Sequence, residues 1–244
     1  MEEKEYQGEW ANPTCLPYSL NLDHLRQVFQ RLTDYGVCLN APKCVLGASE
    51  VPFLGYTINA SGIHPPDSRV EAVRAYPRPQ TMRDLRRYLG MINFFRRMLP
   101  RAAESLAPLN ALLAGPNAKE TRPVPWNDTA VSAFERCKEL LSTATLLAHP
   151  DPNAQLALFT DASGFSMGAS LQQLVDNVGY PLAFFSKSFS NAQKSYSTYD
   201  RELLAVYEAI KYFRHLLQAR PFVIHTDQRP LTFAFKQKPE RCSP

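Results

Sequence analysis

Two apolar runs in the last third of the chain end in the same dipeptide, Thr-Asp, and this repeat constrains the fold more than any other feature. The first run, 156–161, reads LALFTD, and the second, 222–227, reads FVIHTD. Short apolar runs are typical of buried strands, yet each of these ends in a carboxylate, Asp161 or Asp227. If the two strands lie side by side and parallel, the two carboxylates meet at one edge of a sheet.

A long amphipathic helix is predicted between the two strands, over residues 196–217. Ser197 and Asp200 have the spacing of a capping box at its start. The apolar stripe of the helix consists of Val206, Ala209, Ile210, Phe213 and Leu217. Glu202 lies at the head of this stripe, whereas the neighbouring charged side chains lie on the opposite face. Glu202 is therefore a charge on the side that should face the sheet.

The three acids Asp161, Glu202 and Asp227 indicate a metal site. Gathering buried carboxylates is unfavourable unless a divalent cation compensates their charge. Carboxylate oxygens without nearby His or Cys suit Mg²⁺ or Mn²⁺ rather than zinc. Two such ions roughly 4 Å apart can activate water and stabilise the leaving oxygen in phosphodiester cleavage. We therefore predict a phosphoryl-transfer site with these acids as catalytic and metal-binding residues; a cap or a salt bridge is the structural alternative for each.

The composition is that of a globular protein without a membrane span. With 244 residues, of which 45% are hydrophobic and 20% charged, the chain can form one large or two modest domains. No apolar run approaches the roughly 18 residues of a membrane span, and the N-terminus is acidic and polar, unlike a signal peptide. The five cysteines are scattered without a CxxC pair, which argues against disulfides and zinc. We expect an intracellular protein, cytoplasmic or nuclear.

Basic residues are concentrated between positions 65 and 110, which hold nine arginines and four acids, a local net charge of +5. A helix predicted over 81–99 sorts its residues onto two faces. The packing face holds Leu85, Tyr88, Leu89, Ile92, Phe95 and Leu99. The opposite face holds Arg83, Arg86, Arg87, Gly90, Asn93 and Arg97. Guanidinium groups match phosphate oxygens, so this face is either a nucleic-acid-binding surface or a solvated helix face.

Prolines divide the chain, and the main boundary falls in the sequence HPDPN at 149–153. Before it we expect a hairpin in 51–65 that turns at 59–62, and helices over 25–35, 67–76, 81–99 and 129–143. After it we expect three strands, one long helix, a further strand and a short helix. The predicted fold class is therefore α+β or α/β: a helical segment with a β-hairpin, then a mixed sheet with a long packing helix.

These motifs resemble, in their order, the RNase H segment of gypsy-type LTR retrotransposon Pol polyproteins. The resemblance is carried by LFTDAS, YSTYDRELLAVYEAIKYFRHLL and HTDQRPL, and upstream by PFLGYTINASGIHPP, LRRYLGMINFFRRMLP and VPWNDTAVSAFERCKELL. It covers about residues 24–244. It implies four parts: an unassigned segment 1–24, a reverse transcriptase palm remnant 25–65, thumb and connection helices 66–149, and an RNase H-like domain 150–244.

The resemblance also implies roles for particular residues. Asp161, Glu202 and Asp227 match the metal-binding acids of the family, with Mg²⁺ or Mn²⁺ as cofactor. The sequence PFLGY matches the primer-grip region, which places Phe53, Leu54 and Gly55 near a primer terminus. The Arg-rich helices match the elements that grip the duplex. The implied activity is cleavage of the RNA strand of RNA–DNA hybrids, and the implied partners are such hybrids, duplex nucleic acid and the rest of the Pol polyprotein.

The chain departs from the family pattern at both ends. The polymerase motif Y-x-D-D should precede Leu25, but residues 1–24 do not contain it, so we expect no DNA polymerisation. A fourth RNase H carboxylate should follow a further strand and helix, whereas the chain stops at Pro244, so we expect a domain that is C-terminally incomplete. Three interpretations remain open: a metal-dependent ribonuclease, a catalytically inactive nucleic-acid-binding remnant of a decayed element, and an open reading frame of such an element with no selected role.

Overall fold

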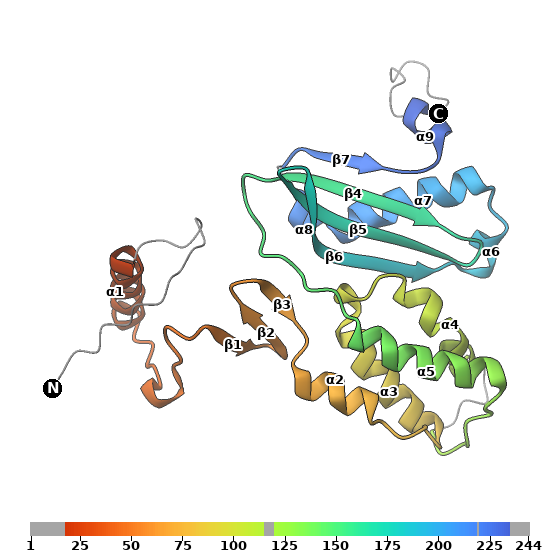
Figure 1. The fold of residues 1–244 in the computed structure, drawn as a ribbon, viewed down its shortest axis with the longest axis horizontal. Coiled ribbons are helices and arrows are strands. Elements are labelled where there is room, and N and C mark those ends of the chain that lie inside the picture. Colours follow the sequence, from red (N-terminus) through yellow and green to blue (C-terminus); the bar gives the residue numbers. More distant parts are fainter. Residues whose placement is uncertain (1–17, 115–119, 219, 235–244) are drawn as a thin grey trace. The chain divides into compact units, whose positions relative to one another are not determined.

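The computed structural model describes residues 18–114, 120–218 and 220–234 (Figure 1). The chain divides into two compact units, residues 1–48 and residues 49–244. In the first unit, helix α1 (Tyr18–Asp34) confirms the helix predicted at 25–35 but begins earlier, and a short 3₁₀ turn η1 (Ala41–Lys43) follows. All sequence-predicted site residues lie in the second unit.

The second unit begins with a three-stranded antiparallel sheet of β1 (Glu50–Phe53), β2 (Tyr56–Asn59) and β3 (Gly62–His64). The predicted turn at 59–62 is confirmed, because Oδ1 of Asn59 accepts hydrogen bonds from the backbone N–H groups of Ser61 and Gly62. A second turn adds a strand to the predicted hairpin. Leu54 and Gly55 have φ angles of 48° and 83°, and positive φ at both central residues is what a type I′ hairpin turn requires.

Four helices follow the small sheet and enclose one hydrophobic core: α2 (Asp67–Arg74), α3 (Met82–Phe94), α4 (Ala102–Leu113) and α5 (Asp128–Ser142). A 3₁₀ turn, η2 (Arg96–Met98), separates α3 from α4. The six apolar residues of the predicted packing face are all buried, as expected. The helix predicted over 81–99 is shorter, however: α3 ends at Phe94, and Phe95 and Leu99 flank η2. Tyr88 of that face donates its hydroxyl to the carbonyl of Phe134 in α5. Helix α4 is not among the predicted helices.

The last part of the chain forms a four-stranded sheet in the order β6-β5-β4-β7 (Figure 1). Strands β4 (Gln155–Ala162), β5 (Ser166–Val175) and β6 (Val178–Ser188) are antiparallel neighbours, whereas β7 (Phe222–His225) pairs with β4 in parallel. The parallel arrangement expected from the two Thr-Asp segments is therefore confirmed. No helix in the described part of the chain is both long enough and apolar enough to cross a membrane.

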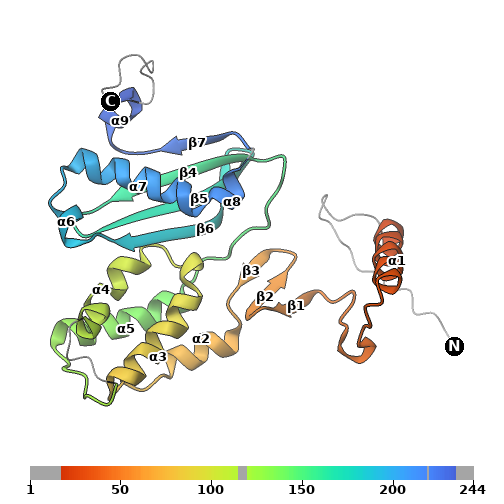
Figure 2. The ribbon, with the colours of Figure 1, turned by 180° about the vertical axis from the view of Figure 1, so that it is seen from behind.

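Helix α7 (Thr198–Tyr212) lies along one face of this sheet, as the view from behind shows (Figure 2). Leu156, Leu158 and Leu171 of the sheet are buried in one cluster with Ala209 and Phe213. The predicted stripe of the long helix therefore faces the sheet. Three short helices complete this part of the chain: α6 (Asn191–Lys194), α8 (Arg214–Leu217) and α9 (Arg229–Ala234).

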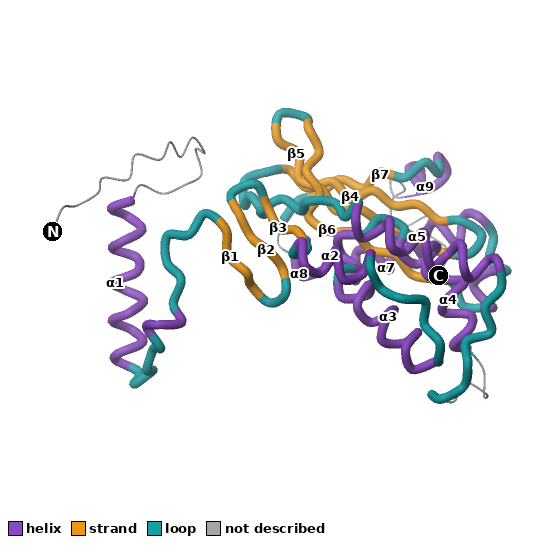
Figure 3. The backbone as a smooth tube through the Cα atoms, turned by 60° about the horizontal axis from the view of Figure 1, so that its bottom comes forward, coloured by secondary structure: helices purple, strands orange, loops and turns teal. Residues whose placement is uncertain are grey.

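The other face of the sheet is covered near β6 by α4 and η2; the strands and helices are separated by colour in Figure 3. Ser186 of β6 makes the polar contacts there. Its carbonyl accepts a hydrogen bond from Nη2 of Arg96 at 2.6 Å, and its hydroxyl accepts one from the backbone N–H of Ala103 at 3.0 Å. On the same face, Phe159 of β4 and Val223 of β7 remain exposed. Among the described residues, the helices therefore cover this face near β6 but leave side chains of β4 and β7 exposed.

Candidate functional site

The ends of β4 and β7 lie next to each other. Leu156 pairs with Phe222, and Phe159 pairs with His225, along the parallel ladder. The rings of Phe159 and His225 stack, with centroids 4.5 Å apart. Each Thr-Asp dipeptide follows directly after this last pair. The register therefore places both dipeptides at the same end of the sheet.

Glu202 reaches this end of the sheet from α7 and is only 4% exposed. Its Oε1 accepts a hydrogen bond from the backbone N–H of Ala162 at 3.2 Å, whereas its Oε2 is buried without a partner among the described residues. Burial raises the pKa of Glu202 to about 7, and the charge of Asp227 and, less strongly, that of Asp161 act in the same direction. The Ala162 hydrogen bond opposes this shift in part. A cation bound to a buried carboxylate beside other acids would offset their mutual repulsion.

Helix α7 begins so that Glu202 faces the sheet. Ser197 caps the helix, because its hydroxyl accepts a hydrogen bond from the backbone N–H of Asp200 at 3.1 Å. The side chain of Arg201 fastens the first turn to the loop after β4 through hydrogen bonds to the carbonyl of Ser163 and the hydroxyl of Thr198. The predicted N-cap is thus confirmed, although the Asp200 carboxylate accepts its bond from the Ser197 hydroxyl and not from the Ser197 backbone, as a full capping box would require. Together these contacts fix the rotation of α7 about its axis.

Asp161 has a partner that the sequence analysis did not single out. Its Oδ2 lies 3.1 Å from Nη2 of Arg101, the residue immediately before α4. Both side chains are largely exposed, 55% for Asp161 and 72% for Arg101. The two residues are 60 positions apart. No spacing or periodicity links them, so the sequence held no signal for this contact beyond the local excess of arginine.

The chemistry of the three acids suits a divalent cation. Asp161, Glu202 and Asp227 offer hard oxygen donors, and the unpartnered Oε2 of Glu202 is a buried acceptor of the kind that Mg²⁺ or Mn²⁺ satisfies. In the ranges that the structure describes, however, no three His, Cys, Asp or Glu side chains are grouped closely enough to hold a metal ion. Asp161 would have to exchange Arg101 for the ion.

The residues predicted near a primer terminus form the tip of the β1–β2 hairpin. Phe53 and Leu54 are exposed there. Gly55 approaches α3 closely, because a Cβ at this position would lie 2.9 Å from the ring of Phe94. Tyr56 holds the tip in place: its ring stacks on Phe94 with centroids 5.2 Å apart, and its hydroxyl donates to the Phe94 carbonyl. The hairpin tip is therefore fixed against the end of the Arg-bearing helix.

The predicted basic face is exposed on α3 and η2. Its members Arg83, Arg86, Arg87, Gly90 and Arg97 all lie at the surface. Apart from its chain neighbours and the backbone of its own helix, no described atom lies within 4 Å of the place where a Cβ of Gly90 would be. The surface is therefore open at this glycine. Within this face, the guanidinium of Arg86 lies 4.0 Å from the carboxylate of Glu120.

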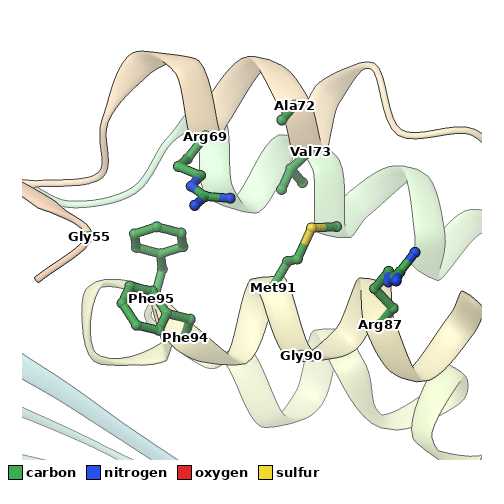
Figure 4. A pocket seen from close by; sticks show the side chains of 9 residues that line it. All are labelled: Gly55, Arg69, Ala72, Val73, Arg87, Gly90, Met91, Phe94 and Phe95. Carbon is green, nitrogen blue, oxygen red and sulfur yellow. The ribbon is translucent and has the colours of Figure 1, made fainter.

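A pocket of about 370 Å³ lies beside this basic face, between α2 and α3 (Figure 4). Figure 4 shows Arg69 of α2 towards the Gly55 end of the pocket and Arg87 of α3 at the other end. The apolar part of the lining consists of Ala72, Val73, Met91, Phe94 and Phe95. The two guanidinium groups therefore lie on either side of an apolar lining.

Comparison with known proteins identifies the larger sheet. Residues 126–224 match the family described as an RNase H-like domain found in reverse transcriptase. This part of the chain is similar to the RNase H-like domains of reverse transcriptases. The matched range runs from the start of α5 to β7, so this RNase H-like domain includes Asp161 and Glu202, and Asp227 follows three residues later.

The RNase H-like domain lies within a longer segment that is similar to transposon polyproteins. The Tf2-3 and Tf2-4 polyproteins of Schizosaccharomyces pombe are each 34% identical to this chain over 216 residues, which is 87% of the chain. The chain spans 16% of the length of these polyproteins. The predicted relationship to gypsy-type LTR retrotransposon polyproteins is therefore confirmed.

Solved structures share the fold of the whole segment. A foamy viral protease-reverse transcriptase in complex with RNA/DNA hybrid matches 95% of this chain with a TM-score of 0.79 and 22% identity, over 31% of that protein. The same viral protein in complex with dsDNA matches 95% of the chain with a TM-score of 0.77 and 21% identity, over 48% of that protein. The predicted mixed fold class is confirmed by these likenesses.

Proposed function

We propose that the RNase H-like domain cleaves the RNA strand of RNA–DNA hybrids in a reaction that depends on Mg²⁺ or Mn²⁺. The observation that supports this most is the end of the sheet, where buried Glu202 retains an unpartnered oxygen beside the segments that carry Asp161 and Asp227. Their mutual repulsion contributes to the raised pKa of Glu202. Acids that repel one another in this way are stabilised by a divalent cation.

Asp161, Glu202 and Asp227 would hold the cation in this proposal. A bound divalent cation lowers the pKa of a water nucleophile and stabilises negative charge on the leaving oxygen. The contribution of the chain is to orient the carboxylates before the substrate arrives. The Ala162 N–H engages one oxygen of Glu202 and leaves the other for the ion. The buried stripe of α7 prevents Glu202 from turning to solvent.

The substrate would lie along the basic face and the hairpin tip. Arg83, Arg86, Arg87 and Arg97 offer phosphate contacts, which position a duplex without reading its sequence. Phe53, Leu54 and Gly55 offer an exposed tip to the end of a strand. The similar foamy viral protein has been solved with an RNA/DNA hybrid and with dsDNA, which supports duplex nucleic acid as the class of substrate.

A cleavage assay on a labelled RNA–DNA hybrid tests the proposal, with the chain purified from a host that lacks RNase H. We expect RNA fragments in Mg²⁺ or Mn²⁺ and none in EDTA. Asp161→Asn should reduce the rate by about 10²–10³-fold, as removal of one preorganised electrostatic contact does. Asp176→Asn, which removes the same charge from the exposed β5–β6 turn, should cleave like the wild type. Cleavage that survives Asp161→Asn would mean that another nuclease or another site is responsible.

A second candidate function is binding of the hybrid without cleavage. It is favoured by the ion pair between Asp161 and Arg101, and by the absence of a closed metal site within the described ranges. In that case affinity for the hybrid would be the same in EDTA and in Mn²⁺, and no metal concentration would produce fragments. Measurements of binding and of cleavage on the same hybrid therefore distinguish the two functions.

The proposal also assigns the other parts of the chain. Residues 25–65 would be a palm remnant with a primer-grip-like hairpin, 66–149 thumb and connection helices, and 150–244 the RNase H-like domain. In the unassigned segment 1–24, residues 1–17 lie outside the described residues, as do 235–244 of the last domain. The rest of the polyprotein would be a partner. An intracellular location, cytoplasmic or nuclear, fits the free thiols of Cys38, Cys44 and Cys137.

A further inference from the structure

Arg101 connects the helical segment to the carboxylate end of the larger sheet. Its guanidinium lies 3.1 Å from Asp161, and both side chains remain largely exposed. A guanidinium binds carboxylate and phosphate oxygens with the same planar geometry. Arg101 can therefore exchange one kind of partner for the other without a change in its own charge.

The backbone at Arg101 is in a conformation that residues other than glycine rarely adopt. Its φ and ψ angles are 51° and 29°, in the left-handed region. The strain of this conformation is at least as large as the stabilisation that an exposed ion pair returns. The contact with Asp161 therefore does not explain why an arginine occupies this position. Strained residues of this kind are concentrated at binding and catalytic sites.

The residues on both sides of Arg101 are anchored to β6. Before it, the half-buried Arg96 donates a hydrogen bond to the carbonyl of Ser186. After it, the backbone N–H of Ala103 donates to the hydroxyl of the same serine. Both bonds hold the loop between η2 and α4 against the sheet. The position of the Arg101 side chain is therefore set by the fold, although the side chain itself is exposed.

A groove of about 180 Å³ lies between Arg101 and the sheet. Arg101 and Pro100 line one side, and Asp161 belongs to the same lining. The sheet contributes the small residues Gly168 and Ala169 together with Phe159. Small and apolar residues beside one guanidinium leave room for a sugar and provide a contact for its phosphate. The groove therefore lies directly beside Asp161, at the end of β4.

We propose that Arg101 is a substrate-positioning residue that binds a backbone phosphate of the nucleic-acid strand at the carboxylate site. The inference rests on the proposed function, because it takes the same strand as ligand. Without nucleic acid, Asp161 holds the guanidinium at the mouth of the groove. If Asp161 bound a cation instead, or were replaced by Asn, the guanidinium would be free to bind the phosphate. Only ionic and hydrogen-bond partners change, and no covalent bond forms or breaks.

A double-mutant cycle of hybrid binding in EDTA tests this inference without requiring cleavage. Kd values for a labelled RNA–DNA hybrid are measured for the wild type, Asp161→Asn, Arg101→Gly and the double variant. We expect Asp161→Asn to tighten binding about five- to tenfold more in the wild-type background than in the Arg101→Gly background, because only the former has a guanidinium to release. Equal effects in both backgrounds would overturn the inference.

Matched variants separate this role from a structural one. Arg101→Gly suits the left-handed backbone, so its melting temperature should not fall. Arg101→Lys keeps the charge and should preserve most of the coupling to Asp161→Asn, whereas Asp176→Asn should show no coupling to Arg101. If Arg101 and Asp161 are coupled in hybrid binding but no cleavage occurs in Mn²⁺, the ribonuclease proposal is rejected and the role of Arg101 as a phosphate contact stands. Cleavage without coupling would keep the ribonuclease and reject the role of Arg101.

Discussion

Glu202 of α7 accepts a hydrogen bond from the backbone N–H of Ala162 at the end of β4, at 3.2 Å. This bond engages one carboxylate oxygen, while the other is buried without a partner in the described part of the chain. Burial, followed by the charge of Asp227, raises the pKa of Glu202 to about 7. The acid therefore changes its protonation state in the neutral range, and the stability of the metal-free protein should depend on pH there.

We predict that the free energy of unfolding falls as pH rises. The pKa of Glu202 is about 7 in the folded state against an ordinary value of 4.5, so the folded state binds more protons between these values. The stabilisation is fully present below pH 4.5 and is lost as pH rises through about 7. From a folded-state pKa of about 7, we expect a loss of about 1–3 kcal/mol between pH 5 and pH 8.

Urea denaturation at several pH values, without divalent ions, measures this loss. Glu202→Gln should remove most of the pH dependence and raise the free energy of unfolding at pH 8. Glu208→Gln is the control, since it changes an acid on the same helix that pairs with Lys187. An unchanged pH slope in Glu202→Gln would assign the effect to another group.

Ser186→Ala should loosen the contact between α4 and β6. The substitution leaves the buried backbone N–H of Ala103 without its acceptor, although the carbonyl at position 186 still accepts from Arg96. A buried donor without a partner costs about 1–3 kcal/mol. Chemical denaturation measures this cost, and Ser188→Ala at the exposed end of β6 should cost much less. Equal stability of the two variants would show that the Ala103 bond contributes little.

Replacing Arg83, Arg86 and Arg87 together by Ala should weaken duplex binding by a similar factor for all sequences. Each lost phosphate contact lowers the slope of log K against log salt by about 0.9. Fluorescence anisotropy at several salt concentrations measures both effects. The charge-matched triple Arg136→Ala, Lys211→Ala and Arg214→Ala removes three cations from other exposed positions and should change the slope less. Identical slopes for the two triples would reject a specific role for α3.

Gly90→Ala should change stability and binding in opposite directions. Alanine in a helix interior is about 0.5–1 kcal/mol more favourable than glycine, and no described atom lies close enough to clash with its Cβ. The added methyl group would, however, stand where a nucleic-acid backbone approaches the basic face. Thermal melts should therefore show a higher melting temperature, and binding assays a weaker affinity for the duplex. Ser132→Ala on the exposed side of α5 should give at most a gain in stability, with no effect on binding.

Periodic patterns in the sequence predicted the elements and their buried faces. The spacing of apolar residues from Leu85 to Leu99 identifies the buried side of α3 and of the turn that follows it. The spacing from Val206 to Leu217 does the same for α7 and α8, and this buried side carries Glu202. Such patterns are predictive because burial of apolar side chains is favourable at every turn of a helix, so the apolar residues repeat with the helical period. The turn at Leu54 and Gly55, which divides the first strand of the predicted hairpin into β1 and β2, was not predicted. Helix α4 was not predicted either, and Pro108 lies inside it.

Contacts between distant residues could not be predicted in this way. Arg101 meets Asp161 across 60 positions and Arg96 meets Ser186 across 90, because α4 and η2 dock on one face of the sheet. The raised pKa of Glu202 likewise depends on how deeply α7 buries it beside Asp227. Periodicity tells which side of an element is buried, but the partner depends on the packing of whole elements. The tertiary structure therefore decides which partner each charged side chain has. The sequence by itself determines whether that side chain lies on a buried or an exposed face.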